Sequence, residues 1–73
     1  MANYSNNEVT YRVQYRVADE WFFEEDQSDP DRIDPPAVRF TFEDAKKHCR
    51  KYGDYLKTTF RIIDKDREVV YYY

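Results

Sequence analysis

The sequence predicts an α+β fold in which two β-hairpins form one antiparallel sheet and a single α-helix packs on one face of it, in the order ββαββ. Three observations lead to this prediction. Residues 9–17 alternate strictly between apolar and polar side chains, residues 41–53 carry helix start and stop signals around an apolar stripe, and residues 58–73 have the composition of two strands joined by a charged turn.

The first strand has two different faces. Its odd positions from Val9 to Val17 are all valine or tyrosine, and its even positions are all polar. Because successive side chains of a strand point to opposite sides of the sheet, the core must cover the odd positions and leave the even ones available. The available positions are Thr10, Arg12, Gln14 and Arg16.

The second strand completes the first hairpin. After a short polar connection at residues 18–20, residues 21–24 resume a β-type composition. We predict that Trp21 and Phe23 share the core face and that Phe22 points to the opposite one.

An acidic loop follows at residues 25–36. This segment contains three prolines and many carboxylates. Proline removes backbone donors and neighbouring carboxylates repel one another, so neither a helix nor a strand is expected here. Residues 37–40 are predicted to be extended and to lead into the helix.

The helix is expected over residues 42–52. Thr41 is a good N-cap, and Gly53 offers the left-handed stop that often ends a helix. The apolar stripe consists of Phe42, Ala45, Cys49 and Tyr52. A cationic side carries Lys46, Lys47, Arg50 and Lys51, for which a solvated helix face is the ordinary interpretation.

The closing hairpin pairs residues 58–63 with residues 68–73 around a turn at 64–67. This register places Ile62 opposite Val69. The core predicted from all elements consists of Val13, Tyr15, Val17, Trp21, Phe23, Phe42, Ala45, Cys49, Leu56, Phe60, Ile62, Val69 and Tyr71.

In this layout the chain resembles small uncharacterised bacterial and phage proteins that have an aromatic first hairpin, one helix and a closing Arg-Ile-Ile-Asp strand followed by Val-Val. The residues that carry the resemblance are Tyr11 to Val17, Trp21, residues 45–49, Arg61 to Asp64, and Val69 with Val70. The long acidic insert departs from the compact versions of this layout. The resemblance implies a bacterial or phage origin and no particular activity.

Length and cysteine usage restrict the class of protein. A chain of 73 residues holds one modest core, so we predict a flexible N-terminus at residues 1–8 and a single domain over 9–73. Cys49 is the only cysteine, and residues 1–8 lack the cationic start and apolar run of a signal peptide. We therefore expect a cytoplasmic protein that makes no membrane contact.

Catalysis is not predicted. His48 and Cys49 are the classical base and nucleophile candidates, but neighbouring residues on a helix point about 100° apart and cannot face one substrate atom. Zinc requires about four ligands, and the acidic loop lacks the carboxylate register of a calcium loop. We expect no enzyme activity, no cofactor and no metal.

The charge is unevenly distributed, and this leads to the functional prediction. Residues 19–34 carry eight acids and one arginine, whereas residues 35–73 carry nine bases and six acids. A local negative field attracts cationic partners, although a merely solvated loop is the simpler alternative. We predict a non-enzymatic interaction module, an accessory or inhibitory protein that binds a basic partner surface through Glu24, Glu25, Asp26, Asp29, Asp31 and Asp34.

Two alternatives remain open. Guanidinium groups interleaved with rings suit phosphates and bases, so the outer sheet face could bind nucleic acid through Arg12, Arg16, Arg61 and Tyr72. The closing strand, which ends in three tyrosines and has no blocking charge or proline after Glu68, could instead pair with a second copy as a homodimer.

Overall fold

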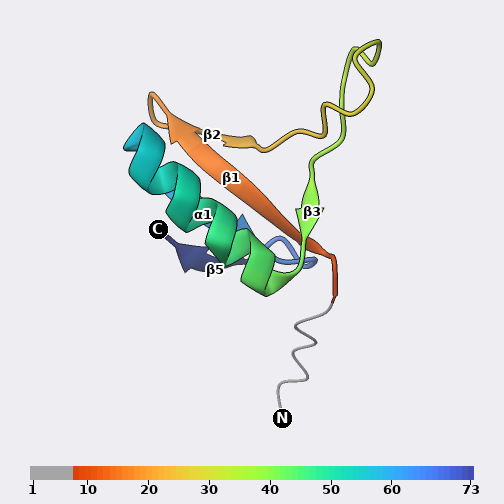
Figure 1. Cartoon of the computed structure of the whole chain (residues 1–73). Coiled ribbons are helices and arrows are strands. Elements are labelled where there is room, and N and C mark those ends of the chain that lie inside the picture. Colours follow the sequence, from red (N-terminus) through yellow and green to blue (C-terminus); the bar gives the residue numbers. More distant parts are fainter. Residues whose placement is uncertain (1–7) are drawn as a thin grey trace.

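The computed structural model describes residues 8–73, in which five strands and one helix follow the order β1, β2, β3, α1, β4, β5 (Figure 1). The predicted flexible segment at residues 1–8 lies outside the described residues except for Glu8. The elements are β1 (Tyr11–Val17), β2 (Glu20–Phe23), β3 (Arg39–Phe40), α1 (Phe42–Leu56), β4 (Phe60–Ile63) and β5 (Val69–Tyr72).

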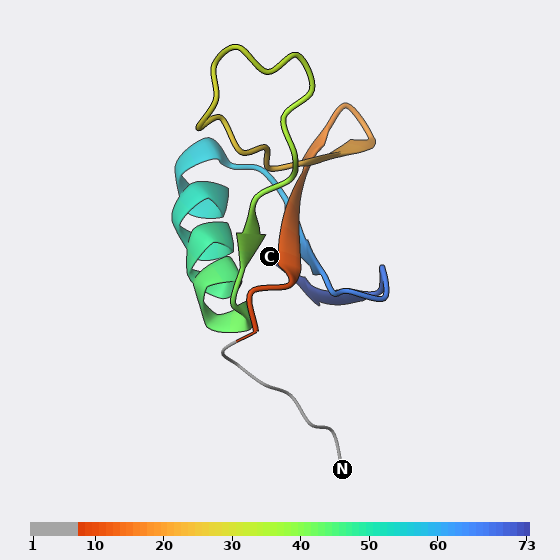
Figure 2. The ribbon, with the colours of Figure 1, turned by 90° about the vertical axis from the view of Figure 1, so that its right-hand side faces the viewer.

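The α+β prediction is confirmed. The antiparallel sheet has the order β2-β1-β4-β5, and α1 covers one of its faces (Figure 2). The ββαββ order omitted the short strand β3, which pairs antiparallel with β1. Pairing of β2 with β1 extends only as far as Gln14, so Tyr11 and Arg12 have an open edge that the extended segment before the helix occupies.

The predicted two-sidedness of β1 is confirmed. Tyr11 and Val13 are only 6% and 1% exposed, whereas Arg12 between them is partly exposed. The strand begins at Tyr11, two residues later than predicted. Val17 was assigned to the core and is instead 50% exposed, because it lies at the end of the hairpin.

The first hairpin closes through a two-residue turn at residues 18–19, both of which have positive φ (50° and 69°). A turn of this length pairs the residues that flank it, so Val17 lies opposite Glu20. The pairing then places Trp21 opposite Arg16.

This register overturns the predicted faces of β2. Directly paired residues share a face, so Trp21 and Phe23 lie on the arginine side of the sheet and not in the core under the helix. Phe22 lies on the helix side opposite Tyr15, and the two ring centroids are 5.9 Å apart. A shift of one residue in the pairing moves every side chain of a strand to the other face of the sheet. Here the two-residue turn sets the register and so determines the face on which each side chain of β2 lies.

The start of the helix is as predicted, and its end is not. The Asp44 backbone N–H donates to the Thr41 hydroxyl at 3.2 Å, which confirms the N-cap. The helix continues to Leu56, however, because Lys57 and not Gly53 adopts the left-handed conformation that ends it (φ 55°). Leu56 was assigned to the core and is 54% exposed in the last turn.

The closing hairpin has a different register from the predicted one. Ile62 lies opposite Tyr71 and Ile63 lies opposite Val69, with a bulge between the two pairs. A bulge adds one unpaired residue to a strand and so changes which side chains share a face. Val69 consequently lies beside the outer-face arginines, and Val70 packs against the core.

The core lies between α1 and the helix side of the sheet. Five of the predicted core residues are fully buried there, and Tyr15, Phe42 and Tyr71 pack at its margin. Val17, Trp21, Phe23, Leu56 and Val69 were assigned to the core wrongly. The buried cluster is Tyr11, Val13, Ala45, Cys49, Phe60 and Ile62.

Candidate functional site

The sheet face opposite the helix combines cationic and aromatic side chains, and we call it the arginine–aromatic face. Its members come from all five strands and from the turn between β4 and β5. They are Arg12, Gln14, Trp21, Phe23, Arg39, Arg61, Lys65, Arg67 and Tyr72.

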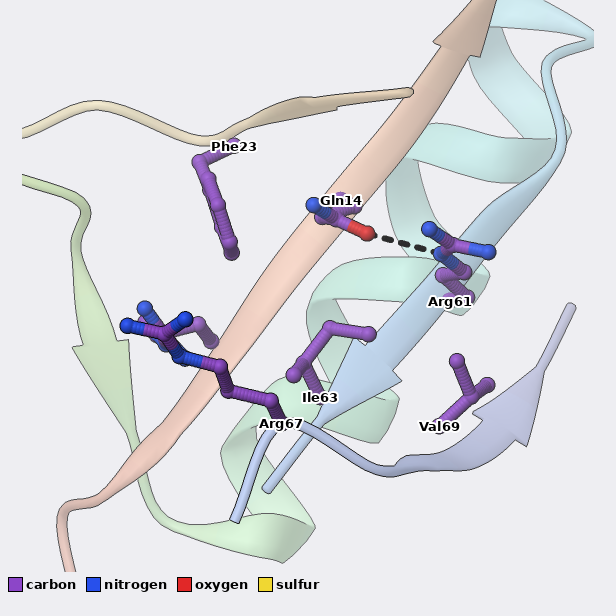
Figure 3. A pocket seen from close by; sticks show the side chains of 7 residues that line it. Gln14, Phe23, Arg61, Ile63, Arg67 and Val69 are labelled. Carbon is purple, nitrogen blue, oxygen red and sulfur yellow. Dashed lines mark hydrogen bonds between the residues drawn. The ribbon is translucent and has the colours of Figure 1, made fainter. Parts of the chain in front are cut away.

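Arg61 is held at the centre of this face by contacts on two sides. Its guanidinium carbon lies 4.0 Å from the centroid of the Trp21 ring, and its Nε donates to Gln14 Oε1 at 2.7 Å (Figure 3). Tyr72 packs edge-on against Trp21 with the ring centroids 6.4 Å apart. A cation over a ring and a hydrogen bond along the face leave little freedom to the guanidinium group, so it is oriented before any ligand arrives.

Arg12 also lies over an aromatic ring of β2. Its guanidinium carbon lies 4.8 Å from the centroid of the Phe23 ring. Arg39 lies directly opposite Arg12 across β1 and β3. Like charges facing each other across a sheet destabilise it, so this pair costs free energy unless an anion lies nearby.

Two adjoining hollows lie on the arginine–aromatic face. The larger has a volume of about 420 Å³, and Phe23 from β2 and Arg67 from the turn between β4 and β5 extend toward it (Figure 3). Its lining consists of Arg12, Gln14, Phe23, Arg61, Ile63, Arg67 and Val69. The smaller has a volume of about 280 Å³ and is lined by Thr10, Arg12, Arg39, Lys65 and Arg67.

The cations of these hollows have no carboxylate partner among residues 8–73. The ion pairs in that part of the chain are Arg16 with Asp19 and Lys46 with Glu43 at 3.0 Å, and the His48 ring contacts Glu24 at 3.5 Å. None of these pairs includes a cation that lines a hollow. Their charge is therefore available to an anionic ligand.

Sequence reasoning found part of this face. It named Arg12, Arg61 and Tyr72, which the structure brings together, and Arg16, which instead pairs with Asp19 at the hairpin turn. It missed the two rings of β2 and the cations of β3 and the last turn. Ala18-Asp19 lacks the glycine that usually marks a two-residue turn with positive φ, so no signal in the sequence fixed the register that places Trp21 and Phe23.

The acidic loop extends away from the helix and the sheet (Figures 1 and 2). Its two ends are tied by backbone hydrogen bonds, from Val38 N–H to the Glu24 carbonyl at 2.8 Å and from Asp26 N–H to the Pro36 carbonyl at 2.7 Å. Glu25 forms an isolated bridge with Ala37 between them. The two ends of the loop are thus held together at its base.

The predicted partner-binding acids have different environments. Asp26 and Asp29 accept backbone N–H groups of Ser28 and Asp31 at 3.0 and 3.1 Å, which is the geometry of turns that aspartate stabilises. The hydrogen bond from Ser28 lowers the pKa of the Asp26 carboxyl below its ordinary value. Asp31 and Asp34 are exposed.

Glu24 does not belong to the exposed part of the loop. Its Oε1 lies 3.5 Å from His48 Nε2, which is buried and has no hydrogen-bond partner. The His48 ring packs among Phe40, Tyr52 and Phe60 with centroid distances of 5.1, 4.6 and 6.0 Å. His48 is therefore a packing residue that helps to hold the loop base against the helix.

Cys49 is enclosed in the core. It is fully buried, and this burial raises the pKa of the thiol to about 11. The thiolate is the reactive form, so a thiol in this environment is a poor nucleophile near neutral pH. The described residues contain no group of three His, Cys, Asp or Glu side chains that could hold a metal ion.

The cationic side of the helix is separate from both the arginine–aromatic face and the acidic loop. Lys46 pairs with Glu43 and lies over the Phe42 ring, and Lys51 lies over the Tyr52 ring. Over residues 8–73, no ion pair connects this side with the acidic loop. No helix within the same residues is long and apolar enough to cross a bilayer.

Comparison with known proteins finds no family model, no curated protein and no solved structure that matches this chain.

Proposed function

We propose that this protein is a non-enzymatic nucleic-acid-binding module and that its arginine–aromatic face contacts the phosphate backbone. One observation carries the proposal. Five cationic side chains without a carboxylate partner among residues 8–73 gather on one sheet face, around two adjoining hollows. They are Arg12, Arg39, Arg61, Lys65 and Arg67.

Arginine is the side chain best suited to phosphate because its planar guanidinium donates two parallel hydrogen bonds. The packing of Arg12 on Phe23 and of Arg61 on Trp21 orients two of these groups in advance. Less side-chain entropy is then lost on binding.

The negative net charge of the protein is compatible with nucleic-acid binding. The chain has a formal net charge of −3, but residues 19–34 contain eight of its fifteen acids. The loop formed by part of this segment extends away from the sheet (Figure 1). A ligand close to the cationic hollows is affected mainly by nearby charges, because physiological salt screens interactions beyond about 8 Å.

The geometry favours recognition of the backbone over recognition of base sequence. Guanidinium groups already lie over the rings of Trp21 and Phe23, which limits stacking of bases on them. Tyr72 is 61% exposed and is the ring of this face best placed to stack on an unpaired base. Phosphate contacts supply affinity and salt dependence but little sequence preference.

The test is a fluorescence titration with mixed-sequence single-stranded and double-stranded oligonucleotides over a range of salt concentrations. The single tryptophan, Trp21, lies on the proposed surface, so binding should change its emission. We expect Arg12→Gln and Arg61→Gln each to weaken binding and to reduce the slope of log affinity against log salt by about one.

The matched control is Lys47→Gln, which removes an exposed cation from the helix on the other side of the sheet. It should leave affinity and salt slope close to those of the unmodified protein. The proposal is wrong if the unmodified protein binds neither kind of oligonucleotide at low salt, or if Lys47→Gln weakens binding as much as Arg12→Gln does.

A second candidate function is the predicted contact between the acidic loop and a basic protein surface. The observation that favours it is Ile33, which is fully exposed between the carboxylates of Asp31 and Asp34. An exposed apolar side chain in a loop where carboxylates outnumber the single cation Arg32 could anchor a partner that the net negative charge attracts. Under either function we keep the cytoplasmic location predicted from the sequence, and pairing of two copies through β5 remains a proposal.

A further inference from the structure

The smaller hollow of the arginine–aromatic face has a composition that suits a more specific ligand than a backbone phosphate. We infer that it binds a terminal phosphate, the phosphomonoester at the end of a nucleic-acid strand. This inference rests on the proposed function and names the part of the ligand that one end of the face recognises. The lining residues are Thr10, Arg12, Arg39, Lys65 and Arg67.

The sheet topology brings these residues together from distant parts of the chain. β4 runs antiparallel to β1 with Ile63 opposite Arg12, so the turn that follows β4 lies beside the start of β1. On the other edge of β1, β3 places Arg39 opposite the same Arg12. The start of β1 is thus flanked on both sides by segments that carry cations.

The turn between β4 and β5 presents its cations from a fixed backbone. Asp64 accepts the backbone N–H groups of Asp66 and Glu68 at 2.8 and 2.9 Å, and its own N–H donates to the Glu68 carbonyl at 2.9 Å. Arg67 adopts positive φ (65°) and donates its N–H to the Asp64 carbonyl at 3.1 Å. One oxygen of the Asp64 carboxylate, Oδ1, therefore accepts both side-chain hydrogen bonds that hold the turn.

The charge of the hollow matches a phosphomonoester better than a phosphodiester. Four cations line it, and no carboxylate is among its lining residues. A phosphodiester carries one negative charge, whereas a terminal phosphate carries about −1.5 to −2 at pH 7 and has three terminal acceptor oxygens. Three guanidinium groups and one ammonium group can pair with such a ligand more completely.

The cost of assembling the hollow without a ligand supports the same conclusion. Arg12 and Arg39 face each other directly across two strands, and Arg67 lines the same hollow. Mutual repulsion of these charges is relieved when an anion lies between them. The Arg12 guanidinium is held over the Phe23 ring, so this side chain is less free to swing away than one surrounded by solvent.

The experiment compares one short single-stranded oligonucleotide in three forms, with a 5′-phosphate, with a 3′-phosphate and with hydroxyl groups at both ends. We expect the full chain to bind one phosphorylated form about tenfold more tightly than the hydroxyl form. Arg39→Gln and Arg67→Gly should each reduce this preference severalfold while both variants still bind the hydroxyl form. Glycine accepts positive φ readily, so Arg67→Gly should preserve the turn.

The matched control is Arg50→Gln, which removes an exposed guanidinium from α1. It should leave the preference for the phosphorylated form intact. Circular dichroism melting of every variant confirms that each is folded under the conditions of the titration.

The outcomes separate this inference from the proposed function. Equal affinity for all three oligonucleotides would overturn the terminal-phosphate site and leave nucleic-acid binding standing. If the preference for the phosphorylated oligonucleotide is unchanged in both Arg39→Gln and Arg67→Gly, the terminal phosphate does not bind in the smaller hollow. Inorganic phosphate is a further probe. If it shifts the amide resonances of Arg39 and Arg67 but no oligonucleotide binds, the hollow binds a small anion, and both the proposed function and the terminal-phosphate inference are wrong.

Discussion

Gly53 shows at the scale of one residue how a missing side chain sets the position of another element. A Cβ atom on this residue would lie 2.6 Å from Cδ2 and 2.9 Å from Cε2 of Tyr73. The Tyr73 hydroxyl donates to Asp54 Oδ1 at 2.6 Å, and this hydrogen bond raises the pKa of the phenol above its ordinary value. The glycine therefore gives a tyrosine ring room to lie against the helix.

The pair of Gly53 and Tyr73 can be tested with a double-mutant cycle. Alanine is favoured over glycine inside a helix by about 1 kcal/mol, so Gly53→Ala should stabilise the Tyr73→Ala variant by that amount. In the presence of the Tyr73 ring the gain should disappear, because the new methyl group displaces the ring. Chemical denaturation of the four proteins measures the coupling. Equal effects of Gly53→Ala in both backgrounds would contradict the contact.

At the scale of an element, the end of α1 is determined by a residue that lacks any sequence signal for it. Lys57 adopts φ 55° and ψ 41°, a conformation that costs a residue with a Cβ atom about 1–2 kcal/mol. The Thr58 backbone N–H donates to the Gly53 carbonyl at 3.3 Å, which satisfies part of the last turn. The helix thus continues past its only glycine to a strained cap.

We expect Lys57→Gly to raise the free energy of unfolding by about 0.5–1 kcal/mol, since glycine accepts the left-handed conformation without a Cβ clash. Urea denaturation measures the change. The matched control is Lys51→Gly inside the same helix, which should lower stability by about 1 kcal/mol. A Lys57→Gly variant that is less stable than the unmodified protein would show that the helix does not end in this conformation.

At the scale of the whole molecule, opposite charges are separated into two surfaces. The acidic loop leaves the edge of the sheet between β2 and β3, where Glu25 and Ala37 form a bridge, and projects away from it (Figures 1 and 2). The smaller cationic hollow is lined by residues from the start of β1, from β3 and from the turn between β4 and β5. Over residues 8–73, no ion pair connects the two. The two surfaces can therefore meet different ligands.

The acidic loop is tested as a binding surface by replacing Asp29, Asp31 and Asp34 with asparagine. We expect association with a lysine-rich peptide to slow severalfold at low salt, because the loop loses three negative charges. Melting should change little, since the side-chain amide oxygen introduced by Asp29→Asn can still accept the backbone N–H of residue 31. Stopped-flow kinetics at low and high salt measures the rate.

The control for this variant is the exposed pair Asp66→Asn and Glu68→Gln in the turn between β4 and β5, which removes negative charge outside the loop. It should leave the association rate with the peptide near that of the unmodified protein. If the triple variant associates with unchanged rate and salt dependence, the loop is not the contact.

Local patterns in the sequence determined the class of the fold and much of its secondary structure. The alternation of residues 11–17 predicts a two-faced strand because side chains of a strand have a period of two. Thr41 predicts the helix start because its hydroxyl satisfies a backbone N–H that would otherwise lack a partner. These effects act between residues close in sequence, so no knowledge of the rest of the chain is needed.

Only the tertiary structure decided which side chains form the candidate site. The alternation of side chains along a strand predicts that Trp21 and Phe23 share a face of the sheet. The register set by the turn at residues 18–19 places them on the face that carries the arginines. Arg39 and Arg67 line one hollow only because β3 and β4 both pair with β1. Strand pairing joins residues far apart in sequence, and a pattern confined to one segment carries no information about its partner.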